Sequence, residues 1–279
     1  MSPSLSVIIP AYNEAARLRK TVRTVLDYLN QHTEESELIV VDDGSSDETA
    51  EIAEQSINDA ARSRTVSARV ICNQPNRGKG HAVRTGLLAA RAPIALFSDA
   101  DLSTPITETP KLIEPIEGGL YDLTFGSRAL DRSLIGVHQP WRREQGGRVI
   151  NLIVRLATGL PFWDTQCGFK AFRMSVCRPL IAASTIDRFG FDVEYLYVAH
   201  LAGLRLSEIP VRWDHNEGSK LSVWRDTPRL LGEVRTIRRQ VQSGVYREAI
   251  RAAHEAAAVE KEQATEVVEP VASAEQGVA

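Results

Sequence analysis

Residues 5–14 read Leu-Ser-Val-Ile-Ile-Pro-Ala-Tyr-Asn-Glu, an apolar run that passes directly into polar residues. Leu5–Pro10 is unbroken and β-branched, as expected of a strand buried on both faces. Asn13 favours a helix start as an N-cap. Apolar residues then recur at helical spacing, at Val22, Val25, Leu26 and Leu29. A buried strand followed by an amphipathic helix is the first half of a βαβ unit.

The alternation of strands and helices continues to residue 97. Strands are predicted at Glu37–Val41, Ala68–Cys72 and Ile94–Phe97. One helix is predicted after Ser45, which forms a capping-box pattern with Glu48, and another over Gly78–Arg91. The pattern predicts an α/β fold with a mostly parallel central sheet flanked by helices. Ligands bind beyond the carboxyl ends of such strands, where three polar clusters lie: Tyr12-Asn13-Glu14, Asp42-Asp43 and Asp99-Ala100-Asp101.

The second half of the chain is less regular, and no composition change divides it. We expect one domain over residues 1–243 that ends in amphipathic helices, and a helical to disordered acidic tail over residues 244–279. The predicted strands are Tyr121–Gly126, Gly168–Phe172 and Arg205–Trp213, and the predicted helices are Arg142–Leu156, Phe191–Leu201 and Thr227–Val241.

Composition excludes several classes of protein. The 279 residues are 43% hydrophobic and 25% charged, which is typical of a soluble globular protein, and the net charge of −3 argues against nucleic-acid binding. Three cysteines are too few for a disulfide framework and favour a reducing compartment. No secretory leader is expected. No apolar run is long enough to span a membrane, because the longest, Val149–Trp163, contains Arg155.

The average charge conceals a gradient along the chain. From residue 251 onward there are six glutamates and two basic residues. Lys220–Arg251 carries eight basic and three acidic residues, and Arg128–Arg155 carries six and two. Each basic stretch is either a solvated helix face or a surface for an anionic partner.

The acidic pair at Asp99 and Asp101 is the first candidate for chemistry. Two carboxylates this close after a buried strand repel each other unless a cation lies between them. Oxygen ligands favour Mg²⁺ or Mn²⁺, often shared with substrate phosphates. Lys79, flanked by glycines, could then contact a phosphate. The alternatives are a solvated turn and a surface lysine. Zinc spacing and the common phosphate-binding loops are absent, and His81, His138, His200 and His215 are interpreted as surface or packing residues.

Four ordered motifs resemble those of the inverting family 2 glycosyltransferases, which have the GT-A nucleotide-sugar fold. They are Val-Ile-Ile-Pro-Ala-Tyr-Asn-Glu (7–14), Val-Val-Asp-Asp-Gly-Ser-Ser-Asp (40–47), Asn-Arg-Gly-Lys-Gly (76–80) and Asp-Ala-Asp (99–101). Within that family, four later segments are similar to those of the polyprenyl-phosphate sugar synthases, in particular the dolichyl-phosphate β-glucosyltransferases: Phe-Gly-Ser-Arg (125–128), Asp-Thr-Gln-Cys-Gly-Phe-Lys (164–170), Phe-Asp-Val-Glu (191–194) and Glu-Gly-Ser-Lys (217–220).

The resemblance implies a role for each matching position. The nucleotide sugar would be bound by Pro10, Ala11, Tyr12, Glu14, Asp42, Asp43, Asn76, Lys79, Asp99, Ala100 and Lys220. Asp99 and Asp101 would hold the Mg²⁺ or Mn²⁺. Arg128 and Arg143 would bind the acceptor's phosphate, although Arg142 or Arg148 could take the place of Arg143. Asp192 is either a general base or a residue that stabilises the start of its helix.

These roles imply transfer of glucose from UDP-glucose to a dolichyl or polyprenyl phosphate. A phosphate acceptor is already anionic, so it needs little help from a base, and arginine binds it through two hydrogen bonds. The rivals are another donor such as GDP-mannose, a soluble acceptor, a non-catalytic nucleotide-sugar binding protein and a nucleotidyltransferase.

The basic helices suggest a membrane partner for this reaction. Basic side chains beside apolar ones would let the helix Thr227–Val241 lie on an anionic membrane, so a peripheral location at the cytoplasmic membrane face is expected. The residues are Arg225, Arg229, Arg235, Arg238 and Arg239 beside Leu230, Leu231, Val234 and Ile237, with Trp141, Trp163 and Trp224 as anchors. The alternative is an ordinary helix packed on the domain.

Overall fold

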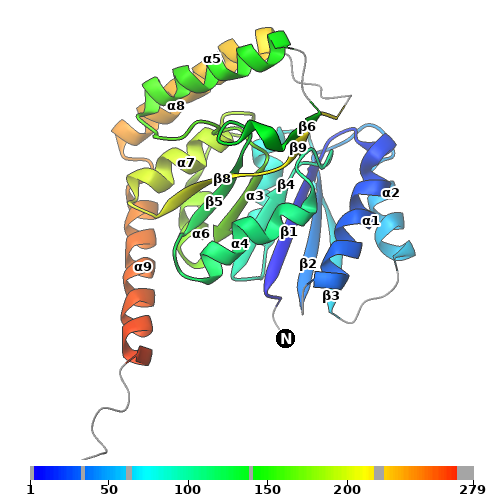
Figure 1. The fold of residues 1–279 in the computed structure, drawn as a ribbon, viewed down its shortest axis with the longest axis horizontal. Coiled ribbons are helices and arrows are strands. Elements are labelled where there is room, and N and C mark those ends of the chain that lie inside the picture. Colours follow the sequence, from blue (N-terminus) through cyan, green and yellow to red (C-terminus); the bar gives the residue numbers. More distant parts are fainter. Residues whose placement is uncertain (1–2, 33–34, 61–64, 138–140, 217–222, 269–279) are drawn as a thin grey trace, which may run out of the picture.

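A twisted central sheet forms the middle layer of the protein (Figure 1). The computed structural model describes residues 3–32, 35–60, 65–137, 141–216 and 223–268, with the side chains of 141–144, 223–226 and 261–268 left out. Within these ranges the sheet has seven strands in the order β3-β2-β1-β4-β7-β5-β8. All neighbouring pairs are parallel except those made by β7. The strands are β1 (Leu5–Ala11), β2 (Ser36–Asp42), β3 (Val66–Cys72), β4 (Ile94–Ser98), β5 (Leu123–Ser127), β7 (Phe169–Arg173) and β8 (Leu206–Pro210).

Helices cover both faces of the sheet because its strands alternate apolar side chains between two cores. Val7 and Ile9 of β1 belong to one core, and Ile8 belongs to the other. The first core is completed by α1 (Ala15–His32), α2 (Thr49–Asp59) and α4 (Thr109–Glu117). The second is completed by α3 (Lys79–Ala89), α5 (Trp141–Thr158), α6 (Met174–Ala183), α7 (Phe191–Leu201), α8 (Val223–Ser243) and α9 (Arg247–Val268). The predicted α/β class, with its mostly parallel sheet, is confirmed.

Two local predictions are wrong. The expected strand Arg205–Trp213 is divided, because the chain leaves the central sheet after Pro210 and forms β9 (Trp213–Asp214), which pairs with β6 (Ile135–Val137). The expected capping box also fails. The hydroxyl of Ser45 donates to the Asp42 carboxylate, and α2 begins four residues later, at Thr49. The short 3₁₀ helices Ile106–Glu108 and Arg132–Leu134 precede α4 and β6.

The helix pair α5 and α8 lies beyond the carboxyl edge of the sheet (Figure 1). Leu230, Val234 and Ile237 of α8 are at most 4% exposed, so these apolar side chains pack on the domain and do not face a membrane as expected. Packing in the core removes these side chains from water, and this burial of apolar surface stabilises the fold. No helix in the described residues is long and apolar enough to span a bilayer.

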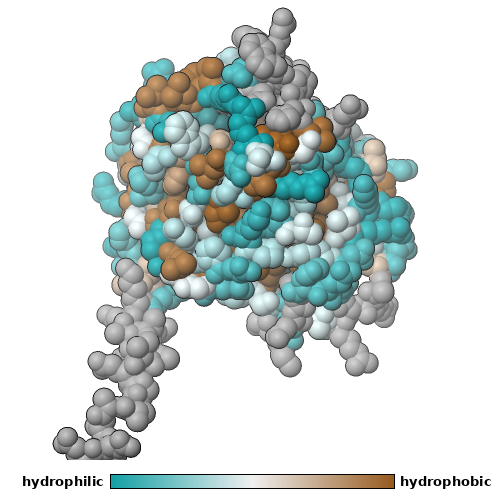
Figure 2. All heavy atoms as spheres, in the orientation of Figure 1, coloured by the Kyte–Doolittle hydropathy of each residue, from teal (hydrophilic) through white to brown (hydrophobic). Residues whose placement is uncertain are grey.

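Exposed apolar side chains lie instead on α5. Val149, Leu152 and Leu156 are each more than half exposed and recur at helical spacing. We call these three residues the α5 stripe, and Figure 2 shows the hydrophobic surface over α5. Beside the α5 stripe, the Arg155 guanidinium lies 3.8 Å from the ring centre of Trp163, which is also more than half exposed.

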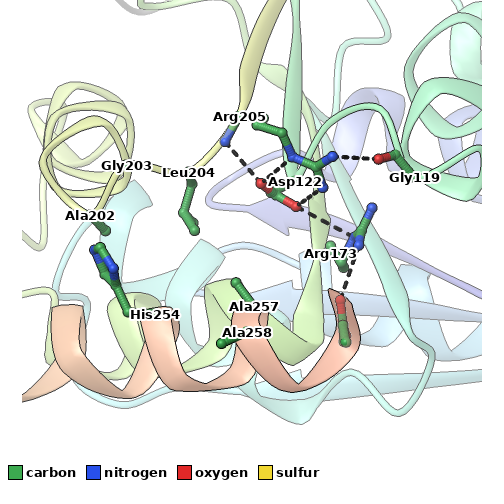
Figure 3. Close-up of a pocket in the computed structure, with 11 residues that line it drawn as sticks. Gly119, Asp122, Arg173, Ala202, Gly203, Leu204, Arg205, His254, Ala257 and Ala258 are labelled. Carbon is green, nitrogen blue, oxygen red and sulfur yellow. Dashed lines mark hydrogen bonds and ion pairs between the residues drawn. The ribbon is translucent and has the colours of Figure 1, made fainter. Parts of the chain in front are cut away.

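At the opposite edge of the sheet, α9 packs against α6 and buries Ala253 completely. A cavity of about 390 Å³ remains between α9 and the amino ends of β5 and β8 (Figure 3). Its charged walls are paired. The guanidinium of Arg205 makes two hydrogen bonds to the Asp122 carboxylate and its backbone N–H makes a third, and Arg173 donates to Glu260 of α9 over 3.0 Å. The Arg173–Glu260 pair links α9 to the sheet.

Candidate active site

The three polar clusters predicted from the sequence lie at the carboxyl edge of the sheet. β1 and β4 are neighbours although β2 and β3 separate them in sequence, so Tyr12 and Asp99 follow adjacent strands. The strand order reverses at this point, which is where open α/β sheets bind ligands. Ala100 is buried, and its carbonyl accepts a 2.6 Å hydrogen bond from Thr21 of α1, which holds the Asp99–Asp101 turn in place.

Asp43 organises the loop that leads into α3. Its carboxylate accepts hydrogen bonds from the Asn76 amide at 2.8 Å and from the Gly78 backbone N–H at 2.6 Å, and the side chain is 2% exposed. Asp42 accepts from the backbone N–H of Ser45. The structure therefore places Asp43 and Asn76 together, and both position the loop that carries Lys79.

Lys79 and Asp99 form an ion pair across the edge of the sheet. The Lys79 ammonium lies 2.6 Å from Asp99 Oδ1. Burial by itself lowers the pKa of Lys79, but the carboxylates of Asp99 and Asp192 outweigh it and raise that pKa, so the lysine stays charged. Gly168 lies under the pair, and a Cβ there would overlap the whole Asp99 carboxylate group. A glycine at this position is what allows Asp99 its orientation.

The surroundings of Asp101 differ from those of Asp99. Asp101 Oδ1 accepts a 2.9 Å hydrogen bond from the Ser103 backbone N–H, and the Asp101 carbonyl accepts one from the Asn216 amide at 2.6 Å. His215 therefore lies on a segment that runs against the Asp99–Asp101 turn. Its imidazole stacks on Trp213, with 5.9 Å between ring centres.

The donor set at this turn fits a hard divalent cation. Asp99 and Asp101 offer carboxylate oxygens, which Mg²⁺ and Mn²⁺ prefer. Among the described residues no three His, Cys, Asp or Glu side chains gather closely enough to hold a metal ion by themselves. Mg²⁺ commonly takes one or two carboxylates and completes its shell with substrate phosphates and water. The residues therefore fit an ion that is bound together with a phosphorylated substrate.

Arg128 follows β5 and is held by Asp164. Its Nε and Nη2 donate to the two oxygens of the Asp164 carboxylate over 2.7 and 2.8 Å. Burial alone would raise the pKa of Asp164, but the facing guanidinium outweighs burial and lowers it. The guanidinium also lies 5.6 Å from the ring centre of Trp213. Asp164 thus fixes the plane in which Arg128 presents its other N–H groups.

Asp192 occupies the second residue of α7 and pairs with a buried lysine. The Lys170 ammonium lies 2.6 Å from Asp192 Oδ1, and Lys170 is fully buried. Burial raises the pKa of Asp192, while the charges of Lys170 and Lys79 oppose that rise. Asp192 therefore has a specific cationic partner, beyond any interaction with the helix N-terminus.

The remaining predicted residues divide into two groups. Pro10 and Ala11 are buried at the end of β1, Tyr12 is 43% exposed, and Glu14 forms a 2.8 Å ion pair with Arg17. Lys220 lies outside the described residues. The side chains of four further residues are also outside the description: Trp141, Arg143, Trp224 and Arg225.

Sequence reasoning singled out neither Lys170 nor Asp187. The Asp187 carboxylate accepts from Arg77 over 2.8 Å and from Arg84 over 2.5 Å, which anchors the Lys79 loop from the other side. One feature of the sequence could have pointed to Lys170: it lies between Phe169 and Phe172 in a predicted strand. Burying a lysine there costs free energy unless its charge is paired.

Comparisons with known proteins agree with this geometry. Residues 6–180 match the model of Glycosyl transferase family 2. The chain is 37% identical over 236 residues to the dolichyl-phosphate beta-glucosyltransferase of Drosophila melanogaster, which covers 79% of this chain and 71% of that protein. It is 34% identical over 232 residues to the Homo sapiens protein of the same name, with 78% and 69% covered.

Solved structures share the fold. The chain superposes on glucosyl-3-phosphoglycerate synthase from Mycobacterium tuberculosis in complex with uridine-diphosphate with a TM-score of 0.60 at 21% identity, covering 84% of this chain and 80% of that one. The TM-score is 0.55, also at 21% identity, for that enzyme with Mn²⁺, uridine-diphosphate and glucosyl-3-phosphoglycerate, covering 88% and 80%. The GT-A architecture expected from the motifs is therefore present. By its family match and its relatives, this chain is a glycosyltransferase and belongs to glycosyltransferase family 2.

Proposed function

We propose that this glycosyltransferase moves glucose from UDP-glucose to a dolichyl or other polyprenyl phosphate, with inversion at the sugar's C1 and with Mg²⁺ or Mn²⁺ bound. The observation that carries the proposal is the identity of 34–37%, over more than three quarters of the chain, to proteins named dolichyl-phosphate beta-glucosyltransferase. Neighbours of the same fold bind UDP and UDP-glucose with Mn²⁺, which is consistent with a UDP-glucose donor.

The charges at the sheet edge suit a donor that leaves as a diphosphate. Asp99 and Asp101 would hold the metal ion, which supplies Lewis-acid stabilisation of the leaving diphosphate. Lys79 adds a fixed cation 2.6 Å from Asp99, on a loop that Asp43 and Asp187 anchor. Such preorganised charges stabilise the transition state without reorganising during the reaction.

The acceptor side suits a phosphate. Arg128 is held in one plane by two hydrogen bonds to Asp164, and its Nη1 edge remains for an anion. A phosphate monoester is ionised at neutral pH and can attack C1 without transferring a proton. A basic residue directly after β5 suits such an acceptor.

We propose further that the enzyme works peripherally at the cytoplasmic face of a membrane, and that the α5 stripe makes the contact. Three apolar side chains on one helix face, with Arg155 and Trp163 beside them, are the composition of an interfacial helix. The exposed arginines of α8, Arg235, Arg238 and Arg239, supply attraction to anionic lipids. The stripe lies beyond the same edge of the sheet as the site, so a lipid phosphate would reach Arg128 from that side (Figure 1).

A phase-partition assay tests the reaction. Nucleotide sugars are first screened by thermal shift with Mn²⁺, and radiolabelled transfer to a polyprenyl phosphate is then followed into the organic phase. UDP-glucose should give both the largest stabilisation and organic-phase label. Transfer from GDP-mannose alone would contradict the donor, and label that stays with a water-soluble phosphate would contradict the acceptor. Tight UDP binding with zero turnover would indicate a binding protein.

Two variants test the parts of the proposal. Arg128→Ala should raise the KM for the acceptor about tenfold or more and leave the KM for UDP-glucose nearly unchanged. Equal effects on both would contradict the acceptor role.

Leu152→Ser with Leu156→Ser should weaken sedimentation with anionic vesicles, whereas the matched exposed pair Leu120→Ser with Leu130→Ser should not.

A further inference from the structure

The pair of Lys170 and Asp192 is the most deeply buried ion pair near the site. The Lys170 ammonium is 2.6 Å from Asp192 Oδ1, donates to the Cys167 carbonyl over 2.5 Å, and lies 5.5 Å from the ring centre of Phe97. Lys170 is fully buried and the Asp192 side chain is 6% exposed. Both charges are therefore held almost without water.

Stability alone is a poor explanation for this pair. Burying two charges costs about as much as their attraction returns, and well-packed apolar residues of similar volume are often equally stable. Lys170 already lies among aromatic rings, because Phe125 is 5.9 Å away on the other side. A methionine of the same length would fill that space. The presence of two buried charges therefore needs an explanation other than stability, and the adjacent candidate active site offers one.

The pair lies next to the charges that bind the donor in the proposed function. Phe191 precedes Asp192 and contacts Phe97, with ring centres 5.7 Å apart. The Lys79 ammonium lies 5.9 Å from the centre of the Phe191 ring, and Asp192 is among the carboxylates that raise the pKa of Lys79. Asp192 thus lies on the side of α7 that faces Lys79 and Asp99.

The proposed transfer reaction would be stabilised by a negative charge beside the sugar of the donor. In the transfer, the bond between C1 and the diphosphate oxygen breaks and its electron pair leaves with UDP, while an oxygen of the acceptor phosphate forms the new bond to C1. No proton moves, because the acceptor is already ionised. Positive charge develops on the sugar ring in such a transition state, and a fixed carboxylate stabilises it.

We propose that Lys170 is a positioning residue of the transfer reaction, which holds the Asp192 carboxylate in place facing the developing positive charge of the sugar. The inference rests on the proposed function and gives Asp192 a role that is neither a general base nor a helix cap. Burial favours the protonated form of Asp192, and the Lys170 ammonium is the closest group that opposes it. Without Lys170, the Asp192 carboxylate loses the 2.6 Å ion pair that fixes its position.

Three variants separate this role from a structural one. Lys170→Met leaves Asp192 buried without its partner, Asp192→Asn removes the negative charge, and the double variant removes both charges together. Arg251→Met with Glu255→Gln is the control, because that ion pair on α9 is more than two thirds exposed on both side chains and lies away from the carboxyl edge of the sheet. For each protein we would measure the melting temperature, kcat, and the KM for UDP-glucose and for a short polyprenyl phosphate.

The expected result is a separation of stability from turnover. Asp192→Asn and Lys170→Met should each lower kcat about 100-fold, with both KM values within about threefold of wild type. The double variant should regain the melting temperature lost by Lys170→Met but keep the low kcat. The control should match wild type in every measurement.

Two results would overturn the inference. A double variant with wild-type kcat would make the pair structural only, even if both single variants fail to fold. A rise in the KM for UDP-glucose at unchanged kcat would make Asp192 a binding residue. Wild-type protein that transfers no glucose to the lipid phosphate gives a different pattern, and it would overturn the proposed function and this inference with it.

Discussion

The two edges of the sheet both bury charge, but they pair it differently. At the amino edge, arginines meet carboxylates through several hydrogen bonds. Glu37 accepts from Arg69 and from the side chain and backbone of Arg91, and Asp122 accepts three hydrogen bonds from the side chain and backbone of Arg205. At the carboxyl edge, two of the pairs use lysines, and Lys79 remains 25% exposed at its side chain.

This difference separates charges that hold the fold from charges that meet a substrate. Arg205 gives Nε and Nη2 to Asp122 and Nη1 to the Gly119 carbonyl, so its guanidinium has little capacity left for a ligand. Among the described residues, Arg128 at the carboxyl edge gives only Nε and Nη2 to Asp164 and keeps Nη1. A lysine is a point charge that can be shared with a phosphate while its carboxylate partner stays in place. Mutations at the amino edge should therefore change stability, and mutations at the carboxyl edge should change turnover.

The largest effect is expected from Asp101→Ala. Removing a carboxylate that would hold the metal ion should lower kcat about 1,000-fold, or about 4 kcal/mol of transition-state stabilisation. The melting temperature without ligand should change little, because Asp101 is half-buried and accepts a single local hydrogen bond from Ser103. Steady-state kinetics with a Mn²⁺ titration checks this, and full activity at high Mn²⁺ would contradict the metal assignment.

The site residues that could be predicted are those that directly follow predicted strands. Unbroken apolar runs predicted β1 and β4, and the carboxyl ends of these strands predicted where Tyr12, Asp99 and Asp101 lie. The direction of β7 could not be predicted, because the residues of a five-residue strand do not specify whether it pairs parallel or antiparallel with its neighbours. Its antiparallel position between β4 and β5 depends on contacts made far away in the sequence.

Glu37→Gln should give the second largest effect, on stability. Glu37 is fully buried although its partners Arg69 and Arg91 are partly exposed, so weakening its charged hydrogen bonds should cost about 2–3 kcal/mol, while kcat per folded molecule should equal that of wild type. Burial alone would raise the pKa of Glu37, but hydrogen bonds from Ser6, Arg91 and Arg69 lower it. Because the pKa of Glu37 is lower in the folded state than in the unfolded state, its ionised carboxylate stabilises the fold at pH values above the unfolded pKa. This stabilisation is lost as the pH falls through the folded pKa. Urea unfolding should therefore show the largest difference between the two proteins near pH 7 and a shrinking one below about pH 4.

The pairings within the site could not be predicted for a related reason. Arg128 with Asp164, Lys79 with Asp99, and Lys170 with Asp192 each join separate elements, and no local pattern records which cation meets which carboxylate. The motif containing Asp164, Gly168 and Lys170 was recognisable, but only the fold shows that this one segment supports three site residues.

Gly168→Ala is the third test of the difference between the two edges, and it adds a single methyl group at the carboxyl edge. The added Cβ would overlap the Asp99 carboxylate and force it away from Lys79. A displacement of this size should lower kcat/KM about 30-fold, or roughly 2 kcal/mol. Gly232→Ala in α8 is the matched control, because a Cβ there meets nothing within 4 Å. Equal activity of the two variants would mean that the position of Asp99 is unimportant.

The smallest effect is expected from Glu260→Gln, at the other edge. The Glu260 side chain is 35% exposed, so its 3.0 Å pair with Arg173 should contribute about 0.5 kcal/mol and shift the melting temperature by only about 1–2 °C. Arg173 keeps its hydrogen bonds to the carbonyls of Ile116 and Tyr121, so the guanidinium does not move. Calorimetry and the transfer assay on the same samples check both halves of the expectation. A clear loss of kcat would mean that α9 communicates with the site, and the division of the two edges into stability and turnover would then be wrong.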